Sequence, residues 1–383
     1  MKCPECQSSI REGAKFCLKC GEKLELKCPQ CGKALPIEAM FCDACGLDLM
    51  KPEETPPIDY NQPHSYTPKH LADKILNNRS SVEGERKLVT VLFADVANYT
   101  SMAEKLDPEE VHQVMDGCFK ILMDEIHKYE GTINQFTGDG VMALFGAPVA
   151  HEDHAQRACY ATLSIQKAMA EYGKKIKEER GMDFLMRIGL NSGPVVVGTI
   201  GDDLRMDYTA AGDTTNLAAR LQSSAEPGTV LVSENSYRLI KDYFEFDNLG
   251  PIDVKGKRHP VTVFRAVQAK NVHSRIEVSA GRGFTPLVAR QAELDQLMAV
   301  FAKAKEGHGQ IVSLVGEAGV GKSRLGHEFK KLLRDEDIIL WESYCPSYGQ
   351  DTPYLPIAQI IKQYCGIEEG DDEVKIREKV TSA

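Results

Sequence analysis

Two aspartates that follow apolar segments are candidates for holding divalent metal ions. Asp139 lies between two glycines in the middle of residues 131–145, where two β-forming segments flank the triplet and predict a hairpin. Asp95 ends another apolar segment, residues 88–94, which we expect to be a neighbouring strand. Either aspartate alone would be an ordinary turn residue. Together, at the ends of neighbouring strands, they form the oxygen ligand set that a pair of hard divalent cations requires.

A helical segment further along the chain carries a polar pair. Residues 213–223 have helical periodicity, and Asn216 and Arg220 lie four positions apart, so their side chains share one face. An amide and a guanidinium on one face can reach the same phosphate. Leu217 and Leu221 supply a separate apolar side, so the polar pair has a defined direction.

A second candidate metal site, His151 and His154 beside two acids, is weaker. Two histidines three positions apart could ligate zinc, but nothing nearby in the sequence completes a coordination shell. Acids and polar residues are common where a loop enters a helix, so we favour a capping role for this segment.

The first 50 residues contain eight cysteines in two copies of the pattern C-x2-C-x10-C-x2-C. This spacing lets two tight knuckles present four thiolates to one zinc ion. So short a segment cannot fold on its apolar surface alone, so we expect two structural zinc ions to stabilise it. The all-thiolate shell leaves no open catalytic position. The expected ligands are Cys3, Cys6, Cys17, Cys20, Cys28, Cys31, Cys42 and Cys45.

Composition predicts a cytoplasmic protein of several domains. The 383 residues suffice for two or three domains, and the net charge of -10 disfavours broad binding to nucleic acid or to anionic membranes. No apolar run approaches the ~20 residues of a membrane span, and no secretion signal begins the chain.

The sequence divides into four parts. Residues 1–50 are the expected double zinc ribbon, with an unspecified protein partner. Residues 51–83 are proline-rich and include a short amphipathic piece, residues 70–76, which predicts a semi-rigid linker that spaces the domains and transmits the state of the ribbons. Residues 84–268 alternate apolar strands with long helical patterns, an α/β arrangement, and residues 284–383 begin a further domain.

Residues 316–323 read GEAGVGKS and satisfy the P-loop pattern. We expect a strand at residues 310–315, then the loop, whose backbone amides would cradle the phosphates of ATP, and then a helix. Lys322 would reach the β- and γ-phosphates and Ser323 the magnesium ion. The loop glycines are Gly316, Gly319 and Gly321. With one or two further strands and no evident Walker B acid, we expect half a domain that binds ATP weakly and hydrolyses it poorly.

Four motifs, in order, resemble the class III nucleotidyl cyclases. They are FADV at 93–96, NQFTGDGVMALFG at 134–146, MRIGLNSG at 186–193 and YTAAGDTTNLAARL at 208–221. The resemblance covers residues 86–268 and implies an α/β (α+β), ferredoxin-like core that works as a dimer with active sites at the interface. The flanking parts resemble bacterial double zinc ribbons and a partial P-loop (AAA/STAND-like) signalling ATPase module.

The resemblance implies a metal site. Asp95 and Asp139 match the two metal-binding aspartates of the family, and the backbone carbonyl of Val96 usually joins them. These groups would hold two Mg²⁺ or Mn²⁺ ions against the triphosphate of ATP.

The resemblance also implies the groups that bind the rest of the nucleotide. Asn216 matches the residue that positions the ribose, and Arg220 matches the one that stabilises charge on the α-phosphate. Arg187 and Lys255 match cationic positions facing the terminal phosphates. Because one chain carries both this set and the metal ligands, a homodimer could assemble two complete sites.

Purine recognition departs from the family pattern. Members that use ATP commonly carry lysine where this chain has Gln135, paired with an aspartate or threonine at the position of Thr209. A glutamine amide can pair with adenine, and the flipped amide suits guanine almost as well. Such neutral hydrogen bonds discriminate by ~1–3 kcal/mol. We expect adenylate cyclase activity with GTP as a side substrate, and guanylate cyclase activity is the alternative.

Two other functions stay open. The cyclase domain could be degenerate and act as a dimerising nucleotide sensor in a signalling ATPase, although a sensor needs none of the transition-state groups. The ribbons could form a nucleic-acid or protein adaptor, but residues 1–50 have no basic run that would favour nucleic acid.

Overall fold

The chain forms two compact units in the computed structural model, Met1–Ile58 and Asp59–Ala383. The structure describes residues 25–27, 33–36, 39–45, 58–60, 62–78, 86–200, 206–209, 213–254, 257, 259–270, 276–278, 283–317, 319–346, 349, 353–368 and 371–383. In the first unit, β1 (Glu25–Lys27) pairs antiparallel with β2 (Ala34–Pro36). Cys42 is buried and Cys45 exposed, and the other six predicted zinc ligands lie outside the described residues.

Residues 86–269 of the second unit form a mixed sheet with helices, as the expected α/β fold class predicts. Its strands lie in the order β4-β5-β3-β6-β8-β10-β9, with β7 paired to β6. Their bounds are β3 (Arg86–Val96), β4 (Thr132–Phe136), β5 (Gly140–Phe145), β6 (Met186–Ile200), β7 (Met206–Thr209), β8 (Val230–Ser233), β9 (Phe244–Ile252) and β10 (Val261–Ala269). The neighbours among β4, β5, β3 and β6 are all antiparallel, which is the ferredoxin-like arrangement.

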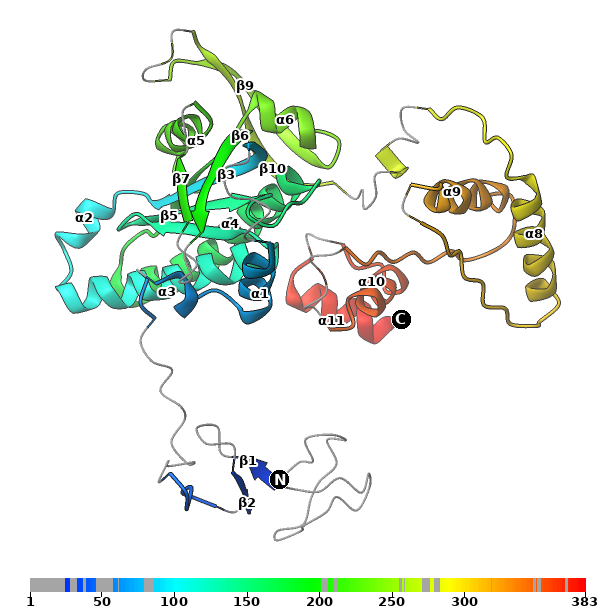
Figure 1. Ribbon diagram of the computed structural model, residues 1–383, viewed down its shortest axis with the longest axis horizontal. Coiled ribbons are helices and arrows are strands. Elements are labelled where there is room, and N and C mark those ends of the chain that lie inside the picture. The colour runs from blue at the N-terminus through cyan, green and yellow to red at the C-terminus, as the bar shows by residue number, and fades with distance from the viewer. Residues whose placement is uncertain are drawn as a thin grey trace. The chain divides into compact units, whose positions relative to one another are not determined.

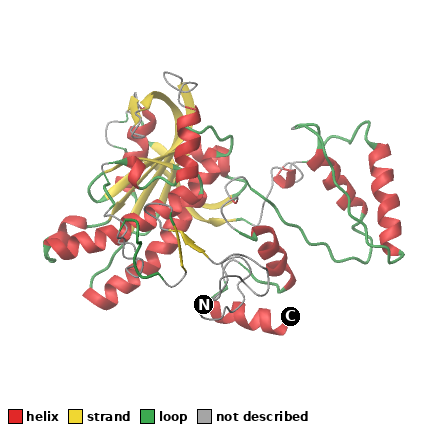
Figure 2. Cartoon of the chain, turned by 60° about the horizontal axis from the view of Figure 1, so that its bottom comes forward, coloured by secondary structure: helices red, strands yellow, loops and turns green. Residues whose placement is uncertain are grey.

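Long helices cover both faces of this sheet (Figures 1 and 2). On one face lie α3 (Pro108–Lys128), which begins with a capping box between Asp107 and Glu110, and α4 (His154–Arg180). On the other face lies α5 (Asp213–Ser224), whose Ala218 packs with Val89 and Val91 of β3. Shorter helices are α2 (Tyr99–Ala103) and α6 (Glu234–Ile240). The strand at 88–94, the hairpin within 131–145 and the helix at 213–223 that the sequence predicted therefore form, with small shifts at their ends.

The segment before the sheet packs against it, whereas the sequence suggested a spacer. After η1 (Pro63–Ser65), the predicted helix forms as α1 (Lys69–Asn78), and its Leu71 and Ile75 pack with Val149. Further upstream, the Tyr60 ring lies 5.0 Å from the ring of Phe136 in β4. Residues 59–78 thus belong to the same compact unit as the sheet.

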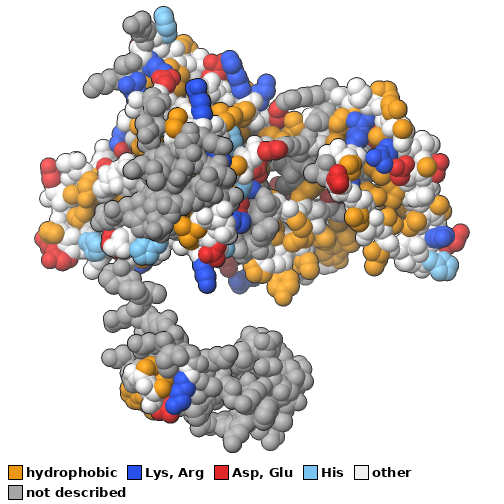
Figure 3. Space-filling model, in the orientation of Figure 1, with side chains coloured by type: hydrophobic (Ala, Val, Ile, Leu, Met, Phe, Trp, Pro, Cys, Tyr) orange, Lys and Arg blue, Asp and Glu red, His pale blue; other side chains and the backbone are white. Residues whose placement is uncertain are grey.

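The expected strand at residues 310–315 is wrong, because this segment has no regular secondary structure. A strand needs a hydrogen-bonded neighbour, and the described residues supply none here, leaving Ile311 98% and Val315 93% exposed. The helices of this part are α8 (Gln291–Lys305), α9 (Lys322–Leu332), α10 (Leu355–Tyr364) and α11 (Glu373–Ser382). Hydrophobic side chains gather on its surface in Figure 3. Within the described ranges, none of the helices combines the length and apolar content that crossing a bilayer requires.

Candidate active site

Asp95 and Asp139 lie side by side because β3 and β5 approach each other closely at Gly140. Asp95 pairs with Gly140 across the two strands, and the amide of Val96 donates to the carbonyl oxygen of Asp139 at 3.0 Å. A Cβ on Gly140 would lie 2.0 Å from the carbonyl oxygen of Ala94, a distance that no side chain tolerates. Glycine at this position therefore brings the two predicted metal ligands together.

Arg187 shares the site with Asp95. The two residues face each other across β3 and β6, and the guanidinium donates from Nε to Oδ1 at 3.1 Å and from Nη2 to Oδ2 at 3.2 Å. Burial raises the pKa of Asp95, Arg187 opposes that shift, and the negative charge of Asp139 adds to it. The two carboxylates thus concentrate negative charge, and the Arg187 guanidinium partly neutralises it.

Helix α5 contacts the β6 backbone directly, on the face of the sheet that carries Arg187 and Asp95. Residues two apart in a strand share a face, so Gly189 and Gly193 lie on the same face as Arg187. A Cβ on Gly189 would lie 2.3 Å from the backbone nitrogen of Gln222, and one on Gly193 would lie 2.6 Å from Oγ1 of Thr214. The two glycines let the helix lie close above the strand.

Asn216 and Arg220 lie on the other side of α5 from the sheet. The buried face of the helix consists of Thr214, Leu217, Ala218, Leu221 and Gln222. At 100° per residue, Asn216 and Arg220 face roughly the opposite direction, and Asn216 is exposed. In a single chain, this polar pair therefore points away from the sheet that carries the metal ligands, and helix α5 lies between the two sets.

Gln222 is a residue of the site that the sequence reasoning missed. Only 7% of the Gln222 side chain is exposed. Burial raises the pKa of the Asp95 carboxyl, and the Gln222 amide opposes that rise. The available signal was a polar residue on the mainly apolar face of a helix, next to Leu221 and one turn after Ala218.

The predicted base-reading and second phosphate-binding residues are described only in part. Gln135 is exposed on β4. Thr209 ends β7, opposite Val196 of β6, and its side chain lies outside what the structure describes. Lys255 also lies outside the described residues.

The histidine cluster proposed as a weaker metal site instead takes part in internal contacts. His154 Nδ1 lies 2.8 Å from Oγ1 of Thr90, and His151 Nε2 lies 3.4 Å from a carboxylate oxygen of Glu130. Glu130 also pairs with Arg157, which is only 1% exposed. Among the described residues, no group of three or more histidine, cysteine and acidic side chains could hold a metal ion.

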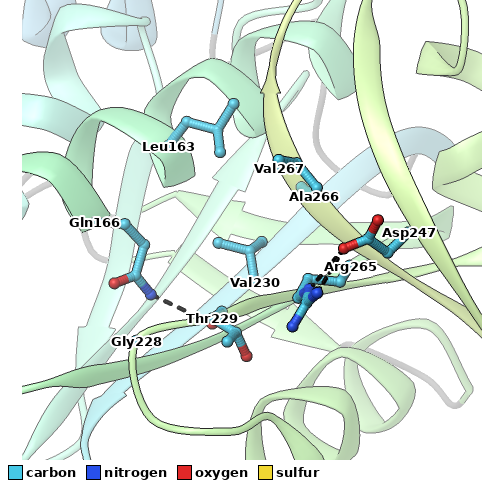
Figure 4. A pocket seen from close by; sticks show the side chains of 9 residues that line it. All are labelled: Leu163, Gln166, Gly228, Thr229, Val230, Asp247, Arg265, Ala266 and Val267. Carbon is cyan, nitrogen blue, oxygen red and sulfur yellow. Dashed lines mark hydrogen bonds and ion pairs between the residues drawn. The ribbon is translucent and has the colours of Figure 1, made fainter. Parts of the chain in front are cut away.

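A cavity of about 300 Å³ lies apart from these residues (Figure 4). Its walls come from α4, β8 with the turn before it, β9 and β10. Gln166 donates to the carbonyl of Thr229, and Arg265 pairs with Asp247, so its polar groups are satisfied internally. None of the predicted catalytic residues lines it.

The predicted P-loop bends as its glycines require. Gly319 and Gly321 have φ angles of 83° and 90°, and Gly321 is the N-cap of α9. The Lys322 ammonium donates to the carbonyls of Gly316 and Glu317 at 2.8 and 2.7 Å. The lysine therefore folds over the loop where the phosphates of a nucleotide would lie.

Three family models match the chain in the order expected from its motifs. The double zinc ribbon model matches residues 3–46, the adenylate and guanylate cyclase catalytic domain model residues 82–266, and the AAA ATPase domain model residues 286–380. The chain therefore carries these three kinds of domain.

Curated relatives include both adenylate and guanylate cyclases. Adenylate cyclase 1 of Rhizobium meliloti is 32% identical over 206 residues, covering 53% of this chain and 31% of the relative. The human guanylate cyclase soluble subunit beta-2 is 29% identical over 226 residues, covering 58% and 35%. The chain thus spans about a third of the length of these relatives.

Solved structures of both kinds also match. The adenylyl cyclase CyaB from P. aeruginosa is 33% identical, with a TM-score of 0.46 over 50% of this chain and 98% of that chain. The guanylate cyclase domain of RhGC from Catenaria anguillulae, in complex with GTP, is 28% identical, with a TM-score of 0.44 over 49% and 100%.

Proposed function

We propose that this chain, which carries an adenylate and guanylate cyclase catalytic domain, converts ATP into 3′,5′-cyclic AMP and pyrophosphate at sites shared by two copies of the chain. The observation that carries the proposal is the contact at Gly140, which brings Asp95 and Asp139 together within that domain. Asn216, Arg220 and Arg187 add the polar and cationic groups that a triphosphate requires.

The donor set fits a pair of hard cations. Two carboxylates and the Val96 carbonyl are oxygen ligands, which Mg²⁺ and Mn²⁺ prefer. The bidentate contact from Arg187 supports this fit, because it occupies the Asp95 carboxylate with positive charge. When bound, the metal ions would acidify the ribose 3′-hydroxyl and neutralise charge on the leaving pyrophosphate.

In the proposed reaction the ribose 3′-oxygen forms a bond to the α-phosphorus. The bond from that phosphorus to the oxygen bridging to the β-phosphate breaks, the hydroxyl proton passes to solvent, and pyrophosphate leaves. Asn216 orients the ribose for in-line attack, and Arg220 donates hydrogen bonds to the α-phosphate as its charge builds. Arg187 leaves Asp95 and pairs with the terminal phosphates.

Two copies of the chain complete each site in this account. The directions of the two residue sets support this, because α5 turns Asn216 and Arg220 away from the sheet that carries Asp95 in the same chain. A partner related by two-fold symmetry would supply the missing set, and the reciprocal site would form at the same interface.

Turnover by the purified full chain tests the activity. We expect cyclic AMP from ATP with Mn²⁺ or Mg²⁺, a smaller yield of cyclic GMP from GTP, and loss of both in Asp139→Ala. Nucleotide binding without a cyclic product from either substrate would support the sensor alternative instead. Higher turnover with GTP than with ATP would make the chain a guanylate cyclase and would reverse our reading of Gln135 and Thr209.

The flanking domains are proposed to regulate this activity. The double zinc ribbon would be held by two zinc ions and bind a protein partner, and the P-loop would bind ATP through Lys322 and Ser323. The φ angles of Gly319 and Gly321 and the position of Lys322 support nucleotide binding there. We keep the prediction that the protein acts in the cytoplasm.

A further inference from the structure

Gln222 is a buried polar residue that the proposed reaction does not use. It lies on the face of α5 that packs against the sheet, next to Leu221, and is 7% exposed. Removing a primary amide from water is unfavourable unless the amide gains partners in the protein. Its presence on this face therefore calls for a specific partner.

One end of the Gln222 amide has a partner, and the other has none among the described residues. Oε1 accepts from the Ser223 hydroxyl at 3.3 Å, whereas Nε2 is buried and has no hydrogen-bond partner within the part of the chain that the structure describes. Phe93 of β3 pairs with Gly189, where the Gln222 backbone touches β6, and Asp95 lies two residues further along β3 on the same face. The unpartnered amide nitrogen is thus buried on the side of the sheet that carries this carboxylate.

The backbone around Gln222 is held in place. A Cβ on Gly189 would lie 2.3 Å from the Gln222 nitrogen and 2.9 Å from its Cα, so α5 touches β6 at this point. Arg187 lies two residues before Gly189 on β6, on the same face, and it pairs with Asp95. The backbone of Gln222 is therefore fixed on the face of the sheet that carries Asp95, within reach of a glutamine side chain from that carboxylate.

We infer that Gln222 is a positioning residue, whose amide holds the Asp95 carboxylate in its metal-binding orientation when Arg187 turns to the nucleotide. Arg187 now supplies hydrogen bonds to both carboxylate oxygens. Once it turns to the phosphates, the carboxylate loses both donors, and Nε2 of Gln222 replaces one of them. A neutral donor orients the carboxylate without competing for the cation, which a second arginine would do.

The inference rests on the proposed function, and its test separates a local role at Asp95 from general packing of α5. Gln222→Met keeps the length and removes the donor, whereas Gln222→Asn keeps an amide that is one carbon too short. The matched control is Thr214→Val, because Thr214 also seats α5 on β6, at Gly193, and donates to the carbonyl of Pro194 at 2.9 Å.

The measurement is Mn²⁺ binding to the full chain by electron paramagnetic resonance in the presence of 3′-deoxy-ATP, which lacks the attacking hydroxyl. Binding that is lost in Asp95→Asn defines the site and removes the contribution of the ribbons and the P-loop. We expect both Gln222 variants to weaken this binding about tenfold, with Thr214→Val within twofold of the wild type.

A shift below threefold in both Gln222 variants, or an equal shift in Thr214→Val, would overturn the inference and leave the proposed function intact. Absence of any Asp95-dependent Mn²⁺ binding in the wild type would instead count against the proposed metal site itself. A variant that does not fold is recognised by its circular dichroism, and the other Gln222 variant then decides.

Discussion

Arg187 holds both carboxylate oxygens of Asp95 across neighbouring strands, at 3.1 and 3.2 Å. The same arginine is the residue that we propose for the terminal phosphates of the substrate. The two roles exclude each other in time, because one guanidinium cannot serve the carboxylate and the phosphates together. When nucleotide and metal bind, we therefore expect metal ions to replace the Arg187 guanidinium at the Asp95 carboxylate.

Replacing Arg187 separates these roles. We expect Arg187→Met to raise the KM for ATP at least about tenfold, because a charged donor to the phosphates is lost. Mn²⁺ binding without nucleotide should become a few-fold tighter, because the competing pair is partly exposed and worth about 1 kcal/mol. Steady-state kinetics and Mn²⁺ titration check the two effects. Weaker Mn²⁺ binding in the variant would contradict the exchange.

Two glycines of one turn should respond differently to alanine. In Gly140→Ala the new methyl meets the β3 backbone, so we expect a loss of about 3 kcal/mol and of turnover, since Asp139 moves away from Asp95. In Gly138→Ala nothing lies within 4 Å, and the cost is the strain of a φ of 85°, about 1–2 kcal/mol. Thermal unfolding and turnover measure both. Equal losses in the two variants would show that the close approach of the strands is unimportant.

Acid should destabilise the domain through His127. This side chain of α3 is buried against Tyr66, and burial, aided by the charge of His70, lowers its pKa to about 4 from an ordinary 6.5. The unfolded chain takes up a proton as the pH falls below 6.5, whereas the folded chain stays neutral until about pH 4. The contribution of neutral His127 to the free energy of unfolding is thus complete above pH 6.5. It declines by up to about 3 kcal/mol as the pH falls towards 4.

Hydrogen exchange of the α3 amides at pH 7 and pH 5, corrected for intrinsic rates, measures this loss. The variant His127→Phe keeps an aromatic ring against Tyr66 and cannot titrate, so its stability should change less between the two pH values. An identical change in the variant and the wild type would assign the pH dependence to other groups.

Zinc content tests the ribbon prediction. We expect two zinc ions per chain by metal analysis and one in Cys42→Ser, because each site needs its four thiolates. The control is Cys118→Ser, a buried cysteine of α3 outside the repeats, which should keep both ions. Two zinc ions retained in Cys42→Ser would refute the ligand assignment.

Periodic patterns were sufficient for most of the catalytic domain. Apolar and β-forming segments predicted β3 and the β4–β5 hairpin, and helical periodicity predicted α5, since these elements bury the residues that define their patterns. The proximity of Asp95 and Asp139 followed from the expectation that their strands are neighbours, and the pairing at Gly140 bears out that proximity.

What the sequence could not supply depends on partners distant along the chain. Residues 310–315 have strand-forming composition, but composition alone does not provide a neighbouring strand. Tyr60 looked like part of a linker, because its contacts with Phe119 and Phe136 arise only after the sheet has formed. Gln222 was missed for the same reason, since its significance comes from Asp95, which lies far away in sequence.

The most direct test of the central claim is complementation between two inactive variants of the full chain. Asp139→Asn removes a metal ligand and Arg220→Ala removes a transition-state group, so each alone should be nearly inactive. When equal amounts are mixed, half of the dimers contain one of each, with one intact site in two, so cyclic AMP formation should recover to about a quarter of the wild-type rate. A mixture as inactive as its components would contradict catalysis at an interface between two copies.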